Sequence, residues 1–227
     1  MGGQACVLYG AAEFSRDTDF AILAGASNLA RLRRALAELQ AEVIAVPPFE
    51  ISYLHRGHAI HFRCQHPEAL RVRLDVISKM RGVDSFEKLW QRRVSIELPD
   101  RTKCEVLSLP DLLQAKKTQR DKDWPMIRRL VEAHYFSNRS HAMLAQVRFW
   151  LKELRTPELL VEVCHSNSTL TRRLSATRPL LLKASAGDLM GLAVELETEE
   201  ASERERDRLY WAPLRRELEA LRHAKRG

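Results

Sequence analysis

Two carboxylates near the start of the chain, Asp17 and Asp19, are followed by the apolar run 20–23. The run predicts a short buried strand. Side chains alternate between the two faces of a strand, so Asp17 and Asp19 share one face about 7 Å apart. Phe20 and Ile22 are expected on the other face, in a core. Two carboxylates on one face form a potential Mg²⁺ site, because this ion prefers oxygen ligands and combines one or two carboxylates with substrate phosphates.

A third carboxylate, Asp75, lies within the next strongly apolar strand, residues 71–77. Alternation places Val72, Leu74 and Val76 on one face of this strand, and Arg71, Arg73 and Asp75 on the other. A buried carboxylate is costly unless it is paired or bound to a metal. Two interpretations therefore stay open: Asp75 is part of a metal site, or it forms a salt bridge with one of the two arginines.

Thirteen residues separate a glycine pair, Gly2 and Gly3, from Asp17. A Gly-Gly pair, a spacer of this length and Asp-x-Asp in an apolar strand resemble the signature of the DNA polymerase β-like nucleotidyltransferase superfamily. The resemblance implies that the glycines open a helix beneath a triphosphate. Glycine suits that role because backbone N–H groups at a helix start bind anions and a missing Cβ lets phosphate approach. Arg16 is expected near the bound phosphate, unless it is an exposed surface cation.

The resemblance also implies the roles of the carboxylates. Asp17 and Asp19 would hold two Mg²⁺ ions, and Asp75 would be the third carboxylate, which shares the metal near the acceptor hydroxyl. The reaction implied is transfer of a nucleoside monophosphate from an NTP to an acceptor, with release of pyrophosphate.

A second block, residues 109–123, reads LPDLLQAKKTQRDKD. It looks like the segment after the catalytic strands in bacterial nucleotidyltransferases related to abortive-infection toxins and small minimal transferases. The resemblance, which covers about residues 1–135, implies that Lys116 contacts the triphosphate and that Arg120 and Asp123 form a nucleotide-binding polar turn. A cation there would meet the charge that builds up on the β/γ-phosphate oxygens. The alternative is an exposed helix end, where cations favour the helix dipole.

Periodicity and turn residues outline the remaining elements. Strands are expected at 43–46, 59–64, 71–77, 94–98 and 104–107, and helices at 4–10, 27–39, 85–93, from 108 and 123–135. Further helices are expected at 141–154, 157–165, 168–174 and 201–224, with Pro179 and Pro213 as breaks and the acid-rich stretch 195–207 as a solvated linker and helix start. The pattern predicts an α/β nucleotidyltransferase domain with a small mixed sheet, residues 1–107, followed by a helical C-terminal domain, residues 108–227.

A series of potential zinc ligands deserves separate consideration: His55, His58, His61, Cys64 and His66. Their spacing would suit a helix face, but the alternation of residues 59–64 and the presence of Gly57 predict a turn and a strand, in which these side chains diverge. Structural zinc sites also usually combine paired ligands from separate segments. The sequence therefore favours magnesium over zinc.

Composition limits the classes of function. The 227 residues are 45% hydrophobic and 30% charged, as in ordinary globular proteins. No apolar run is long enough to span a membrane, and the N-terminus does not resemble a signal peptide. The four cysteines are widely spread without C-x-x-C, so we expect reduced thiols and a cytoplasmic location.

The charge distribution suggests a partner. Of the formal net charge of +7, most comes from residues 101–184, which carry 16 Lys and Arg against 8 Asp and Glu. A basic middle suits a polyanion such as nucleotide phosphates or nucleic acid, unless it is only a solvated basic surface. The resemblance allows RNA, a protein hydroxyl or a small molecule as the acceptor; the basic stretch favours RNA, which with the resemblance implies a toxin-like activity. The alternative to an enzyme is a catalytically degenerate nucleotide- or partner-binding module, since the helix and strand that precede the glycines in the superfamily are represented here by Met1 alone.

Overall fold

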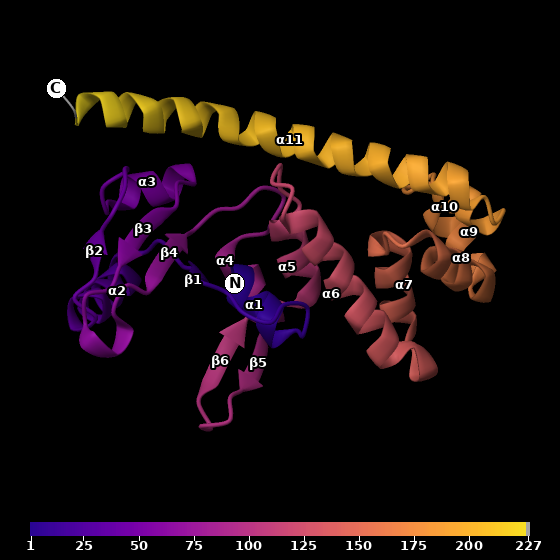
Figure 1. Cartoon of the computed structure of the whole chain (residues 1–227), viewed down its shortest axis with the longest axis horizontal. Coiled ribbons are helices and arrows are strands. Elements are labelled where there is room, and N and C mark those ends of the chain that lie inside the picture. The colour runs from indigo at the N-terminus through magenta and orange to yellow at the C-terminus, as the bar shows by residue number, and fades with distance from the viewer. Residues whose placement is uncertain (226–227) are drawn as a thin grey trace. The chain divides into compact units, whose positions relative to one another are not determined.

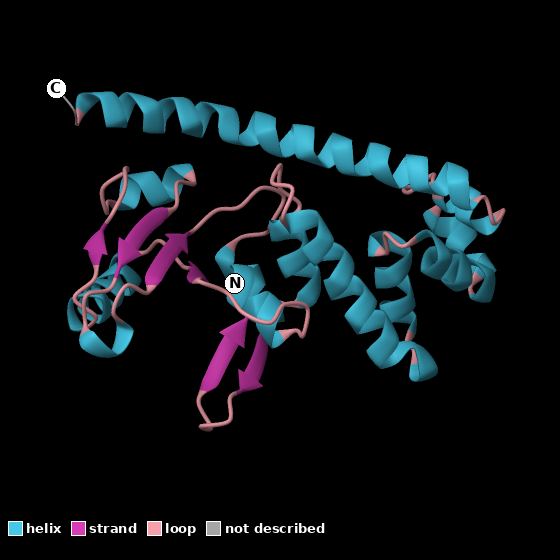
Figure 2. Ribbon diagram, viewed as in Figure 1, coloured by secondary structure: helices cyan, strands magenta, loops and turns pink. Residues whose placement is uncertain are grey.

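The computed structural model describes residues 1–225, which divide into two compact units. The first unit comprises Met1–Lys116 and the segment from Arg208, and the second comprises Lys117–Asp207. The chain is mixed α/β, as expected, with a small mixed sheet, a separate two-stranded sheet and a long C-terminal helix (Figures 1 and 2). The domain boundary expected at residue 107 stays a prediction.

The main sheet of the first unit has four strands in the order β1-β4-β3-β2. These are β1 (Asp17–Ala21), β2 (Glu42–Val43), β3 (Ile60–Arg63) and β4 (Arg73–Ile77). β1 pairs in parallel with β4, whereas β4 with β3 and β3 with β2 pair antiparallel. β1 is therefore an edge strand with one free side.

The core of the first unit forms on one face of this sheet. Helix α2 (Ala26–Glu38) contributes buried Leu29 and Leu36, and helix α3 (Ile51–Arg56) contributes buried Leu54. They pack with the inward-facing sheet residues Ile60, Phe62 and Val76. These side chains alternate along β3 and β4, so the expected polar and apolar faces of both strands are confirmed.

One expectation about β1 is wrong. Ile22 packs against the core, but the side chain of Phe20 is 46% exposed. Phe20 is not part of the core cluster that Ile22 joins, and its side chain instead lines a pocket with Phe86 and Trp90.

The rest of the first unit consists of short elements. Helix α1 (Gly2–Leu8) precedes β1, and helix α4 (Phe86–Arg92) precedes the antiparallel hairpin of β5 (Val94–Glu97) and β6 (Lys103–Val106). The hairpin was expected from its polar turn, in which the Thr102 N–H donates to Asp100. Helix α5 (Leu109–Lys116) follows, and Ser108 accepts a hydrogen bond from the Asp111 N–H at its start.

The second unit is helical. It contains α6 (Asp123–Asn138), α7 (Leu144–Glu153), α8 (Pro157–Ser166), α9 (Ser168–Leu174), α10 (Leu181–Ser185) and the first part of α11 (Leu189–Ala224). Two short 3₁₀ helices, Pro67–Ala69 in the first unit and Arg139–His141 in the second, complete the elements. Buried leucines and other apolar residues from each helix form its core, including Ile127, Leu130, Leu151, Leu160 and Leu181.

The linker expected at residues 195–207 and the break expected at Pro213 are wrong. α11 is continuous from Leu189 to Ala224, through the stretch expected as a linker and through Pro213. The acidic residues of this stretch are stabilised by nearby cations, such as the i,i+4 pair of Glu200 with Arg204. Composition alone made the segment resemble a solvated linker. In the first unit, Glu217 of α11 pairs with the buried His58 at 2.7 Å.

Within residues 1–225, the search for helices both long enough and apolar enough to cross a membrane finds none.

Candidate functional site

Three of the predicted site residues lie side by side on β1 and β4. In the parallel pairing, Asp19 is opposite Asp75, and Asp17 is opposite Arg73. Neighbouring strands are about 4.8 Å apart, and residues two positions apart point to the same face. The core occupies the face of Val76, so Asp17, Asp19 and Asp75 share the opposite face. The structure thus brings the three carboxylates together.

The glycine pair is pressed against β1. A Cβ added to Gly2 would lie 1.8 Å from Oδ2 of Asp19, and one added to Gly3 would lie 2.3 Å from Oγ of Ser15. Gly2 also has a φ of +64°, a conformation that favours glycine. The Met1 amine donates to the Asp19 carbonyl at 2.7 Å. Only residues without a side chain allow the start of α1 to approach the carboxylate so closely.

Asp19 lies in an electrostatic environment that penalises its charge. Burial and the neighbouring charge of Asp75 raise its pKa above the ordinary value, while a Gly3 N–H at 3.4 Å, the Met1 amine and Lys116 act in the opposite direction. Lys116, the last residue of α5, is thus among the charges that act on Asp19. A net raised pKa means that these partners compensate the buried charge incompletely, so Asp19 would be stabilised by an additional cation.

Asp75 is held differently. Arg73 donates from Nε to Oδ1 at 2.9 Å and from Nη2 to Oδ2 at 3.0 Å, and His61 Nδ1 lies 2.8 Å from Oδ1. Burial acts to raise the pKa of Asp75, but the hydrogen bonds with His61 and Arg73 outweigh it, and the pKa is lowered. Of the two arginines that the sequence offered as salt-bridge partners, Arg73 is the one that pairs with Asp75.

His61 is the partner of Asp75 that the sequence analysis did not identify, whereas Arg73 was one of the two expected salt-bridge partners. Arg73 and Asp75 are two positions apart on one strand, so their common face could be inferred from the sequence. His61 reaches the same place because β3 pairs antiparallel with β4 and sets His61 opposite Asp75. That neighbour depends on the strand order, which the sequence pattern does not give.

The other predicted site residues lie outside the carboxylate face. Arg16 is exposed directly before β1. Arg120 and Asp123 belong to the second unit, where Arg120 Nε donates to Oδ2 of Asp123 at 2.7 Å. Asp123 is 2% exposed and also accepts a hydrogen bond from the Thr118 hydroxyl at 2.6 Å.

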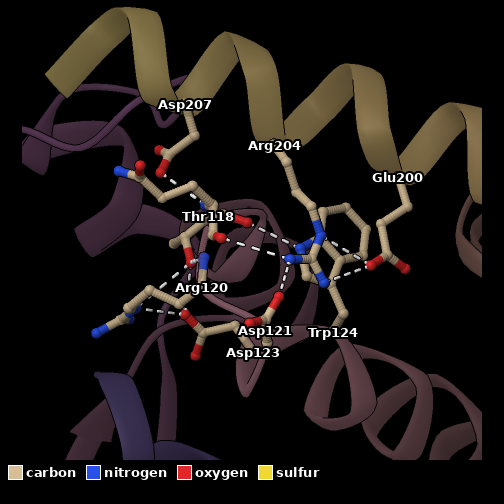
Figure 3. A network of polar contacts seen from close by, with 9 residues as sticks. Thr118, Arg120, Asp121, Asp123, Trp124, Glu200, Arg204 and Asp207 are labelled. Carbon is tan, nitrogen blue, oxygen red and sulfur yellow. Dashed lines mark hydrogen bonds and ion pairs between the residues drawn. The ribbon is translucent and has the colours of Figure 1, made fainter. Parts of the chain in front are cut away.

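Figure 3 shows that the turn containing Arg120 and Asp123 is tied to α11 inside the second unit. Asp207 accepts from the Gln119 N–H at 2.8 Å, and the indole N–H of Trp124 donates to the Thr118 carbonyl at 2.8 Å. Arg204 pairs with both Glu200 and Asp121. The polar residues of this turn therefore have partners of their own within the second unit.

Mg²⁺ prefers oxygen ligands, and the carboxylate face of β1 and β4 provides some of them. Among residues 1–225, no group of three His, Cys, Asp or Glu side chains is arranged so that it alone could hold a metal ion. Asp17 and Asp19 fit a site in which the protein gives two carboxylates and the substrate gives phosphate oxygens. Asp75 is engaged by Arg73 and His61, so it fits as a third ligand only after these contacts are exchanged.

Comparison of the chain with protein families, with curated proteins and with solved structures finds no significant match.

Proposed function

We propose that the protein is a metal-dependent nucleotidyltransferase with the fold of the polymerase β-like superfamily, and that it transfers a nucleoside monophosphate from an NTP to an acceptor. The observation that carries the proposal is the carboxylate face of β1 and β4, with Gly2 packed against Asp19. The incompletely balanced charge of Asp19 supports a cation at this face.

The proposed roles follow from the charges. Asp17 and Asp19 bind Mg²⁺, and two such ions, when bound, stabilise the attacking and leaving oxygens of an in-line displacement. The acceptor oxygen forms a bond to the α-phosphorus, the bond to the bridging oxygen breaks, and pyrophosphate leaves. Lys116 offsets charge on the β- and γ-phosphates. Asp75 acts on the acceptor side, where it receives the proton of the hydroxyl after exchanging its contact with Arg73.

RNA is the proposed acceptor, with a protein hydroxyl or a small molecule as the alternatives. The second unit exposes two arginine doublets, Arg128–Arg129 on α6 and Arg172–Arg173 on α9. Arg128 also donates to Glu132 and Thr156, so the second doublet is the cleaner probe of binding. Phosphate contacts make affinity depend on salt, by roughly 0.7–0.9 log units per contact per log unit of salt.

The experiment is to incubate the protein with Mg²⁺, each radiolabelled NTP, and total RNA or total protein, and to identify the fraction that takes label. We expect label on RNA, and we expect it to decrease in Arg172→Ala/Arg173→Ala. The control is the Arg215→Ala/Arg216→Ala doublet variant on α11, which should label normally. Label on protein alone would contradict the RNA acceptor, and absence of label with every NTP would contradict the transferase.

A second candidate function is a nucleotide- or partner-binding module without turnover. The specific observation in its favour is the pairing of Asp75 with Arg73 and His61, which already balances the charge of the third carboxylate. Such a module would bind Mg²⁺–NTP stoichiometrically and release no pyrophosphate. Measuring bound NTP and free pyrophosphate in one reaction separates the two functions.

A further inference from the structure

A pocket of about 380 Å³ in the first unit opens beside β1. Most of its walls are apolar: Phe20 and Ala21 of β1, Phe86 and Trp90 of α4, and Cys104 and Leu107 of the β6 segment. Phe20 and Trp90 are both 46% exposed, and leaving two large aromatic side chains in contact with water costs free energy. Phe86 and Trp90 are stacked, with ring centroids 5.8 Å apart and an interplanar angle of 19°, and the Arg93 guanidinium lies 4.1 Å from the centroid of the Trp90 ring, so a bound base would replace Arg93 on that face or stack on Phe86.

The polar groups of this pocket are the charged side chains of Arg93, Lys103 and Glu105, of which Arg93 and Glu105 pair at 2.8 Å, and the free edge of β1. The Ile22 N–H donates to the Ile77 carbonyl of β4, so even-numbered residues of β1 direct their backbone N–H and C=O toward β4 and odd-numbered residues direct theirs to the free edge. The carbonyls of Asp17 and Asp19 are accordingly occupied by the Ser15 hydroxyl and the Met1 amine.

Ala21 is the next odd-numbered residue, and it lines the pocket. Within residues 1–225, no hydrogen bond is described for its N–H or its C=O on this edge. The pocket therefore combines aromatic surface with one backbone donor, one backbone acceptor and a few charged side chains, as small-molecule sites commonly do.

We propose that this pocket receives the nucleobase of the nucleotide substrate, an inference that rests on the proposed function. A base presents an adjacent donor and acceptor on its edge and a flat face for stacking, which match the backbone N–H and C=O of Ala21 beside aromatic rings. An added peptide strand fits less well, because strand addition uses several successive peptide groups and those of Asp17 and Asp19 are partly occupied. Ala21 is two residues from Asp19, about 7 Å along the strand, so a ribose could connect the pocket to the carboxylate face.

The native cysteines provide a direct test. Cys104 lines the pocket and is half-buried, whereas Cys6, Cys64 and Cys164 are buried. Under native conditions iodoacetamide should therefore alkylate Cys104 first, which peptide mass spectrometry can follow. We expect at least one of adenosine, guanosine, cytidine and uridine to slow this alkylation in a saturable way, without Mg²⁺. Tripolyphosphate, which has no base, should give no protection.

Variants of Trp90 show whether protection comes from the pocket. Trp90→Ala should weaken the nucleoside concentration dependence by roughly fivefold to a hundredfold, the range for losing one base–aromatic stack. Trp90→Phe should restore most of the affinity. Phe14→Ala is the matched control, because Phe14 is an exposed aromatic residue, 70% exposed, that does not line the pocket.

Each outcome decides one of the two proposals. If label is transferred from an NTP but no nucleoside and no NTP protects Cys104, the base pocket is wrong and the transferase stands. Protection by tripolyphosphate alone, or protection unchanged in Trp90→Ala, likewise overturns the base pocket. If nucleosides protect Cys104 through Trp90 but no NTP gives transfer, the pocket stands and the transferase is wrong.

Discussion

The two units hold shielded carboxylates in contrasting ways. In the second unit, Asp123 is 2% exposed and receives short hydrogen bonds from Thr118 and Arg120. In the first unit, Asp19 receives a long hydrogen bond of 3.4 Å from the Gly3 N–H and faces the like charge of Asp75. The hydrogen bonds to Asp123 compensate its buried charge, whereas the surroundings of Asp19 penalise its charged form.

This contrast indicates which carboxylate is retained for something other than stability. A buried carboxylate with full partners stabilises the turn that it closes, and its removal should be felt in folding. A carboxylate beside a second carboxylate carries an electrostatic cost, which the proposed bound cation would offset. Asp75 is intermediate, because Arg73 and His61 already balance its charge.

The largest expected effect tests the carboxylates of the first unit. Asp17→Asn with Asp19→Asn should abolish Mg²⁺-dependent NTP binding and reduce nucleotide transfer more than roughly a thousandfold, because metal stabilisation of the transition state is worth several kcal/mol. Without metal, the thermal midpoint should hold or rise, since repulsion is relieved. Calorimetry of binding and of unfolding checks both. A variant that unfolds would mean that these carboxylates are structural.

The second prediction applies the contrast to the other unit. Asp123→Ala should lower the free energy of unfolding by about 1.5–3 kcal/mol, because it removes hydrogen bonds to a charged group. Urea unfolding measures this loss, and Thr118→Val, which removes one of the donors, is the matched control with a smaller loss. NTP affinity should be retained if Asp123 is structural. A fall in affinity without a fall in stability would instead support the nucleotide-binding role that the resemblance implies for Arg120 and Asp123.

A third prediction concerns the cation near Asp19. Lys116→Ala should weaken triphosphate binding roughly tenfold to a hundredfold, as expected for a charge-assisted contact of about 1.5–3 kcal/mol, and monophosphate binding much less. Titration with an NTP and with the corresponding NMP gives the two affinities. Lys116→Arg keeps the charge and should lose less. Equal losses for both nucleotides would argue against contact with the β- and γ-phosphates.

Local patterns predicted much of the fold of the first unit. Alternation located β3 and β4 and their buried faces, and the polar turn at residues 99–100 located the β5–β6 hairpin. Helix α3 was not anticipated, because the His55-Arg56-Gly57 segment resembles a turn; Gly57, with a φ of 100°, ends the helix instead. The continuous α11 was missed because its stability depends on partners distant in sequence, such as Arg178 for Glu199.

The candidate site was also predicted only in part. The spacing of the glycines and of Asp17 and Asp19 predicted that they belong to one region, and the contact of Gly2 with Asp19 gives the physical reason for glycine. The pairing of His61 with Asp75 follows from the strand order β1-β4-β3. Strand order is a long-range property, which local periodicity does not contain.

The smallest expected effect separates Asp19 from Asp75 by the pH dependence of stability. The folded-state pKa of Asp19 is raised above 3.8, so the folded protein holds this proton more tightly than the unfolded chain does. Its charge therefore reduces stability as pH rises from 3.8 through the raised pKa, and the full cost is present above it. Asp75 has a lowered pKa, so its contribution is favourable above 3.8 and is lost as pH falls through the lowered value.

Single substitutions of Asp19 and Asp75 measure these opposite contributions to stability. At neutral pH and without metal, Asp19→Asn should hold or raise the free energy of urea unfolding, whereas Asp75→Asn should lower it. Near pH 3, roughly the range in which carboxylates become protonated, both differences from the wild type should shrink. If Asp19→Asn is the more destabilising of the two at neutral pH, the charge of Asp19 is compensated in the free protein, and its contrast with Asp123 would not hold. If Asp75→Asn is neutral, the pairing with Arg73 contributes little, and Asp75 would be free to exchange its contact with Arg73 for the acceptor.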